Sequence, residues 1–315
     1  MWLRTSRLIF LIQSNYGFES ILRSTMSQYL LIRMIAIATC IWIMMLFFLI
    51  RKKFRKTAIV FGVVFGLCVW IRFVEPSMIH VKYETIDLWV WKRVVVIADL
   101  HLWVYKSQNY LSRVIQKINA IEDSSMILIA WDFLNNALPR QPLDELFGPL
   151  AQVRVPWYAV MWNHDLWYPW EDRGDELTAV LQWLWGSVID NQIIPFEDRT
   201  LVGLWSNFAG NDDVTVLEDL ESDNSVVVLT HNPDTISKYP KDIVDLTIVG
   251  HTHCGQVRIP WLYESYRRSI MPTAGDFDCW LTQEDTTQLF ITPWIGEVGL
   301  PIRFFNPPTL SVLDL

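Results

Sequence analysis

Val94-Val-Val-Ile-Ala-Asp-Leu-His101 is an apolar run that ends in an aspartate and a histidine. A run without polar alternation is typical of a strand buried on both faces of a sheet. Similar runs occur at Met126–Ala130, Tyr158–Met161, Val226–Thr230 and Leu246–Val249, and the tail adds Gln288–Thr292 and Leu310–Leu313. The sequence therefore predicts a set of buried strands spread along most of the chain.

Helical segments separate these strands. Apolar residues recur at helical spacing in Leu111–Ile121 and in Asp175–Trp185. Strands that alternate with helices in this way indicate an α/β fold.

The predicted strands of the body are followed by polar residues that can bind a metal ion. A lone histidine after a strand is usually structural, but ligands gather at the carboxyl ends of strands in open α/β sheets. The set includes five of the six histidines in the chain and consists of Asp99, His101, Asp132, Asn163, His164, Asp165, His231, His251 and His253. Two carboxylates, one carboxamide and four imidazoles from this set would fill two metal sites, and such mixed ligands suit Mn, Fe or Zn.

The order of these motifs resembles the calcineurin-like metallophosphoesterase superfamily. The matching elements are Asp-x-His, a strand-end Asp, Asn-His-Asp, a lone His and Gly-His-Thr-His. The stretches His231–Asp234, Gly250–Pro260 and Gly299–Pro308 resemble its membrane-associated bacterial branch, which includes enzymes similar to UDP-diacylglucosamine hydrolases. The resemblance covers residues 80 to 315 and implies a four-layer αββα sandwich around two divalent metal ions.

The resemblance also implies a role for each residue of the set. One metal would be held by Asp99, His101 and His253, the other by Asn163, His231 and His251. Asp132 would bridge the two metals. His164 would orient the phosphoryl oxygen and assist the leaving group, while Asp165 would hold its tautomer.

The reaction implied by the resemblance is hydrolysis of a phosphoester or a pyrophosphate. Two metals about 3.5 to 4 Å apart generate a bridging hydroxide for in-line attack and neutralise charge on the phosphoryl oxygens. Because the chain carries a predicted membrane segment, a lipid-linked substrate is the leading expectation. Soluble nucleotides and cell-envelope phosphodiesters follow.

Tryptophan stands at several positions where the family has glycine. These positions are Trp103, Trp131, Trp162 and Trp294. Two explanations compete. In the first the tryptophans block the site and the protein is a catalytically inactive scaffold or binding module, because an indole buries on the order of 200 Å² beside a phosphate site. In the second they are glycines of a lineage in which UGA encodes glycine, and the excess of 17 tryptophans over 13 glycines favours this reading.

The N-terminal region predicts a membrane hairpin. Met34–Ile50 carries no charge and Ala58–Val74 carries only Arg72, so each run approaches the roughly 20 residues needed to span hydrocarbon. The basic loop Arg51–Lys56 between them is predicted to stay in the cytoplasm, which places the body on the outer side of the cytoplasmic membrane. One span plus a buried helix, or a signal peptide, are the alternatives.

These patterns divide the chain into three predicted parts. Residues 1–28 form an N-terminal extension of uncertain status, in which Met26 is an alternative start. Residues 29–75 form the two membrane helices, and residues 76–315 form the phosphoesterase domain.

Charge and cysteine content exclude other classes of protein. Residues 76–315 hold 16 Lys and Arg against 32 Asp and Glu, so a binder of the nucleic-acid backbone is not expected. The four cysteines lack the C-x-x-C spacing of a zinc ribbon, and no disulfide framework is predicted.

Overall fold

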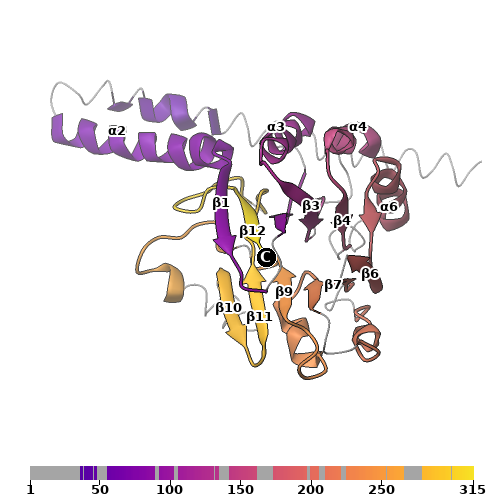
Figure 1. The fold of residues 1–315 in the computed structure, drawn as a ribbon. Coiled ribbons are helices and arrows are strands. Elements are labelled where there is room, and N and C mark those ends of the chain that lie inside the picture. Colours follow the sequence, from indigo (N-terminus) through magenta and orange to yellow (C-terminus); the bar gives the residue numbers. More distant parts are fainter. Residues whose placement is uncertain are drawn as a thin grey trace, which may run out of the picture. The chain divides into compact units, whose positions relative to one another are not determined.

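The protein is described here by a computed structural model (Figure 1). The described residues are 36–37, 39–44, 46–47, 55–88, 92–102, 106–130, 132–134, 142–161, 173–196, 199–205, 210–220, 225–252, 254–265, 279–298 and 300–315. The chain forms two compact units, Met1–Trp70 and Ile71–Leu315.

The helical region around the unit boundary is apolar and exposed. It consists of the α-helix α2 (Arg55–Val69), the π-helical turn η1 (Trp70–Val74) and the 3-10 turn η2 (Glu75–Ser77). Among the described residues, one helix is long and apolar enough to cross a membrane, namely Ile59–Ser77 with a mean hydropathy of 1.9. Most of the basic loop and much of the first apolar run lie outside the described residues, so the two-helix hairpin stays a prediction.

In the described part of the body, the strands form two six-stranded sheets. The first has the order β1-β12-β2-β3-β4-β5 and the second the order β10-β11-β9-β8-β7-β6. The strands of the first sheet are β1 (His80–Thr85), β12 (Thr309–Asp314), β2 (Arg93–Ile97), β3 (Ser124–Ile129), β4 (Trp157–Ala159) and β5 (Ser187–Val188). Those of the second are β10 (Trp280–Glu284), β11 (Thr287–Ile291), β9 (Leu246–Val249), β8 (Val226–Leu229), β7 (Arg199–Gly203) and β6 (Gln192–Phe196).

Both sheets are mixed, with a parallel centre. Strands β2, β3, β4 and β5 are parallel, while β12 runs antiparallel to β2. In the second sheet β11, β9, β8 and β7 are parallel, and β10 and β6 are antiparallel to their neighbours. The carboxyl ends of the central strands of each sheet therefore lie at one edge, which is where the polar residues follow.

Apolar side chains of the two sheets share one core. Val95 and Ile97 of the first sheet belong to the same buried cluster as Leu229, Ile248 and Phe290 of the second. The two sheets thus pack face to face, which agrees with the mixed α/β architecture that the resemblance implies.

Helices cover the outer side of the first sheet. They are α3 (Gln108–Asn119), α4 (Leu143–Phe147) and α6 (Gly174–Trp183), with the 3-10 helix η3 (Gly148–Gln152), and Figure 1 shows α3, α4 and α6 together on one side. Helix α3 buries Leu111, Val114, Ile115 and Ile118, the spacing of a helix with one apolar face. Among the described residues, the helices after β7 and β8 are the short 3-10 helices η4 (Val214–Leu217) and η5 (Pro233–Lys238).

The buried strands and both helices predicted from the sequence are confirmed within a few residues. The sequence missed strands whose residues are not uniformly apolar, such as the edge strands β1 and β6. An edge strand stays partly exposed on both faces, so its sequence carries no continuous apolar run.

A disulfide is present, although the sequence analysis predicts no disulfide framework. Cys254 and Cys279 form a disulfide that joins the loop after β9 to the start of β10. These two segments meet because β9 and β10 both flank β11. Pairing across a sheet cannot be read from the spacing of cysteines along the chain.

Candidate metal centre

The candidate site lies at the carboxyl ends of strands from both sheets. Asp99 and Asp132 follow β2 and β3 of the first sheet. His231 and His251 follow β8 and β9 of the second. Each residue lies two or three positions beyond its strand, so the parallel strands bring side chains from distant parts of the sequence to the same edge.

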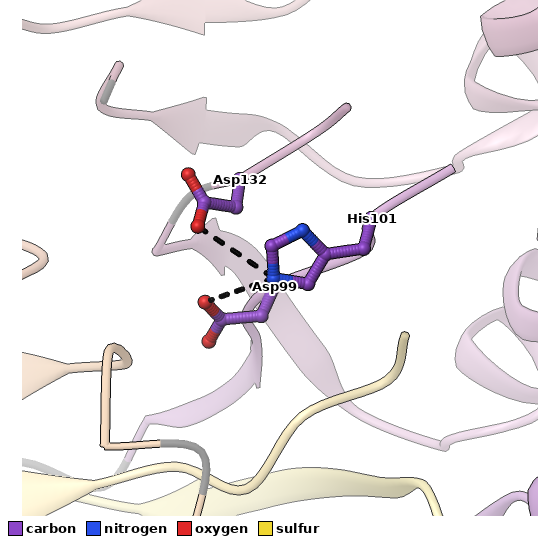
Figure 2. Close-up of side chains that lie close together, drawn as sticks. All are labelled: Asp99, His101 and Asp132. Carbon is purple, nitrogen blue, oxygen red and sulfur yellow. Dashed lines mark ion pairs between the residues drawn. The ribbon is translucent and has the colours of Figure 1, made fainter. Parts of the chain in front are cut away.

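Three of the predicted ligands meet in one buried cluster. Ligand atoms of Asp99, His101 and Asp132 all lie within 4.8 Å of one another. His101 Nε2 is 3.8 Å from Asp99 Oδ1 and 3.6 Å from Asp132 Oδ2, and Figure 2 shows both carboxylates beside the imidazole. None of the three residues is more than 1% exposed.

The chemistry of this cluster fits a divalent metal ion. Two carboxylates buried at this separation repel each other, and burying charge is costly unless an opposite charge compensates it. A divalent cation among the two carboxylates and the imidazole would supply that charge. Oxygen and nitrogen ligands together suit Mn, Fe or Zn.

The backbone of the cluster is strained. Asp99, His101 and Asp132 have φ angles of 51°, 42° and 41°, and His251 has 62°. Non-glycine residues seldom adopt this left-handed conformation, and strain of this kind concentrates at functional sites. The peptide N–H of His101 donates to the Asp132 carbonyl at 2.8 Å, which joins the two strained turns.

Two glycines let other segments approach Asp99. A Cβ built on Gly250 would lie 2.7 Å from Asp99 Oδ2, so a side chain there would displace the carboxylate. A Cβ on Gly296 would collide with the Leu100 carbonyl, and the N–H of Gly296 donates to the Asp99 carbonyl at 2.8 Å. The loop that carries His251 and the loop around Gly296 thus pack directly on the residues of the first cluster.

His231 and His251 form a second group of ligand-competent atoms. His251 Nδ1 lies 3.0 Å from His231 Nε2, and the ring centroids are 4.8 Å apart. His231 is fully buried and His251 is half-buried. Because Gly250 contacts Asp99, this pair lies next to the first cluster rather than at a separate place.

The remaining predicted site residues lie outside the described part of the chain. They are Asn163, His164, Asp165 and His253. Trp103, Trp131 and Trp162 also lie outside it. The roles of the four site residues, and the effect of the three tryptophans on the site, therefore stay predictions.

Trp294, where the family has glycine, is buried against the cluster. It is 4% exposed, and its ring centroid lies 5.5 Å from that of His101 at an angle of 54°. The indole therefore occupies the immediate surroundings of a predicted ligand, as the sequence analysis anticipated for a side chain of this size.

A buried ionic network behind the site was missed by sequence reasoning. Arg303 donates to Glu297 and to the carbonyls of Trp294 and Gly296, and Lys106 lies 3.1 Å from the Glu297 carboxylate. Burial lowers the pKa of Lys106 to about 8, although Glu297 opposes this shift. The network holds the loop whose Gly296 contacts Asp99. The sequence gave no sign of this role, because the partners of Arg303 are one carboxylate and several backbone carbonyls that only the folded loop brings together.

Comparison with known proteins identifies similar sequences. Residues 92–255 match the sequence model of calcineurin-like phosphoesterases. Bacillus subtilis YkuE, named an uncharacterized metallophosphoesterase, is 26% identical over 78% of this chain and 88% of its own length. A Helicobacter pylori protein of the same description is 22% identical over 71% of this chain. The aligned region spans 59% of the length of that protein.

A third relative carries a more specific name. The Chlamydia trachomatis protein named UDP-2,3-diacylglucosamine pyrophosphatase LpxG is 25% identical over 309 residues. The alignment covers 78% of this chain and 92% of LpxG.

Proposed function

We propose that this chain, which belongs to the calcineurin-like phosphoesterase family, is a membrane-anchored, metal-dependent phosphohydrolase with a dinuclear centre. The observation that carries this proposal is the buried cluster of Asp99, His101 and Asp132 at the carboxyl ends of β2 and β3. Its donor set and its neighbouring histidine pair provide ligands for more than one ion.

The ligands divide between the two ions as the family pattern does. Asp99, His101 and His253 would hold one ion, Asn163, His231 and His251 would hold the other, and Asp132 would serve both. The contact between Gly250 and Asp99 supports this division, because it places the His251 loop beside the first cluster. When bound, the two ions supply a nucleophilic hydroxide and neutralise charge on the phosphoryl oxygens.

His164 and Asp165 act on the substrate rather than on the ions. His164 orients a phosphoryl oxygen and donates a proton to the leaving group. Asp165 holds the imidazole in the tautomer that can do so.

The substrate is a phosphoester or pyrophosphate that is linked to lipid. The name of the Chlamydia relative supports this class, since its substrate pairs a pyrophosphate with two acyl chains. The apolar helix Ile59–Ser77 supports attachment to a membrane. In this proposal residues 29–75 form the anchor and residues 76–315 the catalytic domain.

The catalytic domain lies on the outer side of the cytoplasmic membrane. The basic loop Arg51–Lys56 favours this orientation. The Cys254–Cys279 disulfide favours it as well, because disulfides persist in oxidising compartments and are rare in the cytosol.

A catalytically inactive scaffold is the second candidate function. The observation in its favour is the buried indole of Trp294 against His101. The two candidates differ in whether phosphoester hydrolysis is measurable once glycine stands at the four positions where the family has it.

The test is hydrolysis of bis(p-nitrophenyl) phosphate with Mn²⁺ by the chain carrying Trp103→Gly, Trp131→Gly, Trp162→Gly and Trp294→Gly. Asp132→Asn in this background should reduce turnover by at least about 100-fold and lower bound metal, because both ions lose a ligand. Asp123→Asn, at an exposed turn, is the control and should change neither turnover nor the amount of bound metal.

His164→Ala separates ligand from catalytic roles. It should lower turnover by about 100- to 10,000-fold and keep the metal content, as expected for a lost general acid. Loss of metal with His164→Ala would contradict its assignment as a catalytic residue. If the chain with the four Trp→Gly changes alone shows no hydrolysis, the inactive scaffold is favoured.

A further inference from the structure

Large apolar side chains are exposed in a group on the body of the protein. Eight of the thirteen that are exposed among the described residues of 71–315 lie on the segments 73–78, 259–262 and 300–305. Leu262, Leu300 and Phe305 are 64%, 69% and 59% exposed. Scattered exposed apolar residues are ordinary, whereas a contiguous group marks an interaction surface.

Hydrogen bonds hold the second and third segments side by side. The N–H of Arg258 donates to the Phe304 carbonyl at 2.8 Å, and the N–H of Phe304 donates to the Gln256 carbonyl at 3.2 Å. Gln256 Nε2 also donates to the Leu300 carbonyl. In Figure 1 the loop with the second segment is orange and the loop with the third segment is yellow.

The third segment is also bonded to the first. The N–H of Arg303 donates to the Ile71 carbonyl at 2.9 Å, and the N–H of Asn306 donates to Glu75 Oε1 at 2.7 Å. Phe305 lies between these two anchors along the third segment, as Phe73 and Val74 do along the first, and all three side chains are exposed. We name the exposed apolar side chains of the three segments the apolar rim.

The apolar rim borders the candidate metal centre. Asn306 Nδ2 donates to the carbonyls of Cys254 and Gly255, and Arg258 donates to the Cys254 carbonyl. These bonds fix the rim to the loop that begins at His251. On the other side Arg303 holds the carbonyl of Gly296, whose N–H is bonded to Asp99.

The first segment indicates that lipid covers the rim, because it is the end of an apolar helix. Residues 71–77 are the last residues of the apolar helix Ile59–Ser77, which is 11% buried and has a mean hydropathy of 1.9. A helix that crosses a bilayer ends in its head-group region, where aromatic side chains are enriched. The rim is hydrogen-bonded to this end of the helix, so its apolar side chains reach the same depth.

We propose that the apolar rim inserts into the head-group region of the bilayer, so that the metal centre it borders lies close to the lipid phosphates. This inference rests on the proposed function and deepens it, because it explains how a membrane-embedded phosphoester reaches the site. Trp261, 94% exposed, belongs to the rim but is not required, since Leu262, Leu300 and Phe305 remain if glycine stands there.

The test measures the depth of the rim in a bilayer. The full chain with Cys40→Ser and Cys68→Ser is placed in nanodiscs of phosphatidylethanolamine and phosphatidylglycerol. A fluorophore is attached at Leu262→Cys or Leu300→Cys, and head-group spin-labelled lipid is added as quencher. Trp185→Cys is the control, because Trp185 is 85% exposed but lies after α6, away from the rim.

Quenching at positions 262 and 300 should exceed that at 185 by about threefold or more. Equal quenching at all three positions overturns the proposal. So does fluorescence at 262 and 300 that depends on protein concentration but not on the quencher, which would show a second copy on the rim.

A second measurement links the rim to turnover. Leu262→Asp with Leu300→Asp should slow hydrolysis of a bilayer-embedded diacylglyceryl p-nitrophenyl phosphodiester about tenfold, the effect of losing part of the burial of two leucines. Hydrolysis of soluble bis(p-nitrophenyl) phosphate should stay unchanged. Equal loss on both substrates overturns the role of the rim, whereas absence of hydrolysis before the substitutions counts against the proposed function and leaves the quenching result to decide the insertion.

Discussion

Three tryptophans adopt a backbone conformation that suits glycine. Trp185, Trp261 and Trp280 have φ angles of 70°, 71° and 75°. A side chain in this left-handed region costs roughly 1 to 2 kcal/mol, a cost that glycine avoids. At the residue scale, the structure thus adds to the hypothesis that some tryptophans of this chain are glycines in the cell.

Trp185 offers the clearest measurement of this strain. It follows α6, where its N–H donates to the Gln182 carbonyl and the next N–H, of Gly186, donates to the Leu181 carbonyl. This bonding pattern ends helices at a left-handed residue that is usually glycine. Trp185→Gly should therefore raise the free energy of unfolding by about 1 kcal/mol.

The matched control is Trp183→Gly. Trp183 is similarly exposed, at 69%, but is the last residue of α6. Glycine there should lower the free energy of unfolding by up to about 1 kcal/mol. Urea unfolding measures the free energy of unfolding of both variants. Equal destabilisation by Trp185→Gly and Trp183→Gly would contradict the strain at Trp185.

The codons test the same hypothesis in the gene. UGA should encode the four tryptophans at family glycine positions, Trp103, Trp131, Trp162 and Trp294. It should also encode Trp185, Trp261 and Trp280, whereas UGG should encode Trp183. The reason is that the family has glycine at the first four positions, that glycine relieves a left-handed backbone at Trp185, Trp261 and Trp280, and that glycine destabilises a helix at Trp183. Sequencing of the gene checks this, and UGG at all of them would favour the inactive scaffold.

At the scale of elements, Asp190 links β5 to the end of β4. Its Oδ1 accepts the N–H of Met161 at 2.7 Å, two residues before the predicted ligand Asn163. Burial raises the pKa of Asp190 to about 7, and the hydrogen bond from Met161 offsets only part of this shift.

This raised pKa predicts a pH dependence of stability. The folded protein keeps the Asp190 proton up to about pH 7, whereas the unfolded chain releases it near pH 3.9. The folded state binds more protons in this window, so the free energy of unfolding falls as pH rises from about 4 to 7. Asp190→Asn should flatten that slope in urea unfolding, and the exposed Asp87→Asn should leave it unchanged.

The network around Arg303 joins the loop after β11 to the rest of the domain. Removing one partner of a buried ion pair leaves the other charge uncompensated. Arg303→Met should therefore lower the free energy of unfolding by about 3 kcal/mol.

Arg93→Met is the matched control for Arg303. Arg93 pairs with Asp314 at 2.8 Å, but both side chains are partly exposed, at 29% and 39%. Its loss should cost less than about 1 kcal/mol. A similar cost for the two changes would show that the Arg303 network does not stabilise the fold.

At the scale of the whole molecule, the disulfide ties stability to the compartment. It closes a loop between residues 25 positions apart and restricts the unfolded chain. Dithiothreitol should lower the melting temperature by about 5 to 10 °C. Cys254→Ser with Cys279→Ser should melt at the lower temperature with or without reductant.

Labelling of intact cells checks the location of the domain. Protein purified without reductant should bear no free thiol at Cys254 or Cys279, and a protease should reach the domain before the cells are lysed. Free thiols at both cysteines, together with protection until lysis, would contradict the outward orientation.

The sequence alone determined the buried apolar strands and the polar positions after them. Apolar runs such as Val94–Ile97 form buried strands wherever they pack, and Asp99, Asp132, His231 and His251 follow directly, so local pattern was sufficient. Resemblance, rather than pattern, assigned their roles.

Only the tertiary structure decided the contacts that join distant segments. The Cys254–Cys279 pair depends on which strands are neighbours in the second sheet. The bonds of Arg303 and the apolar rim depend on how the loop after β11 returns against other segments. No periodic pattern in the sequence predicts such contacts, because they are made between single residues and backbone groups. The apolar runs place strands in the core, whereas the geometry of strand pairing places these residues beside the site.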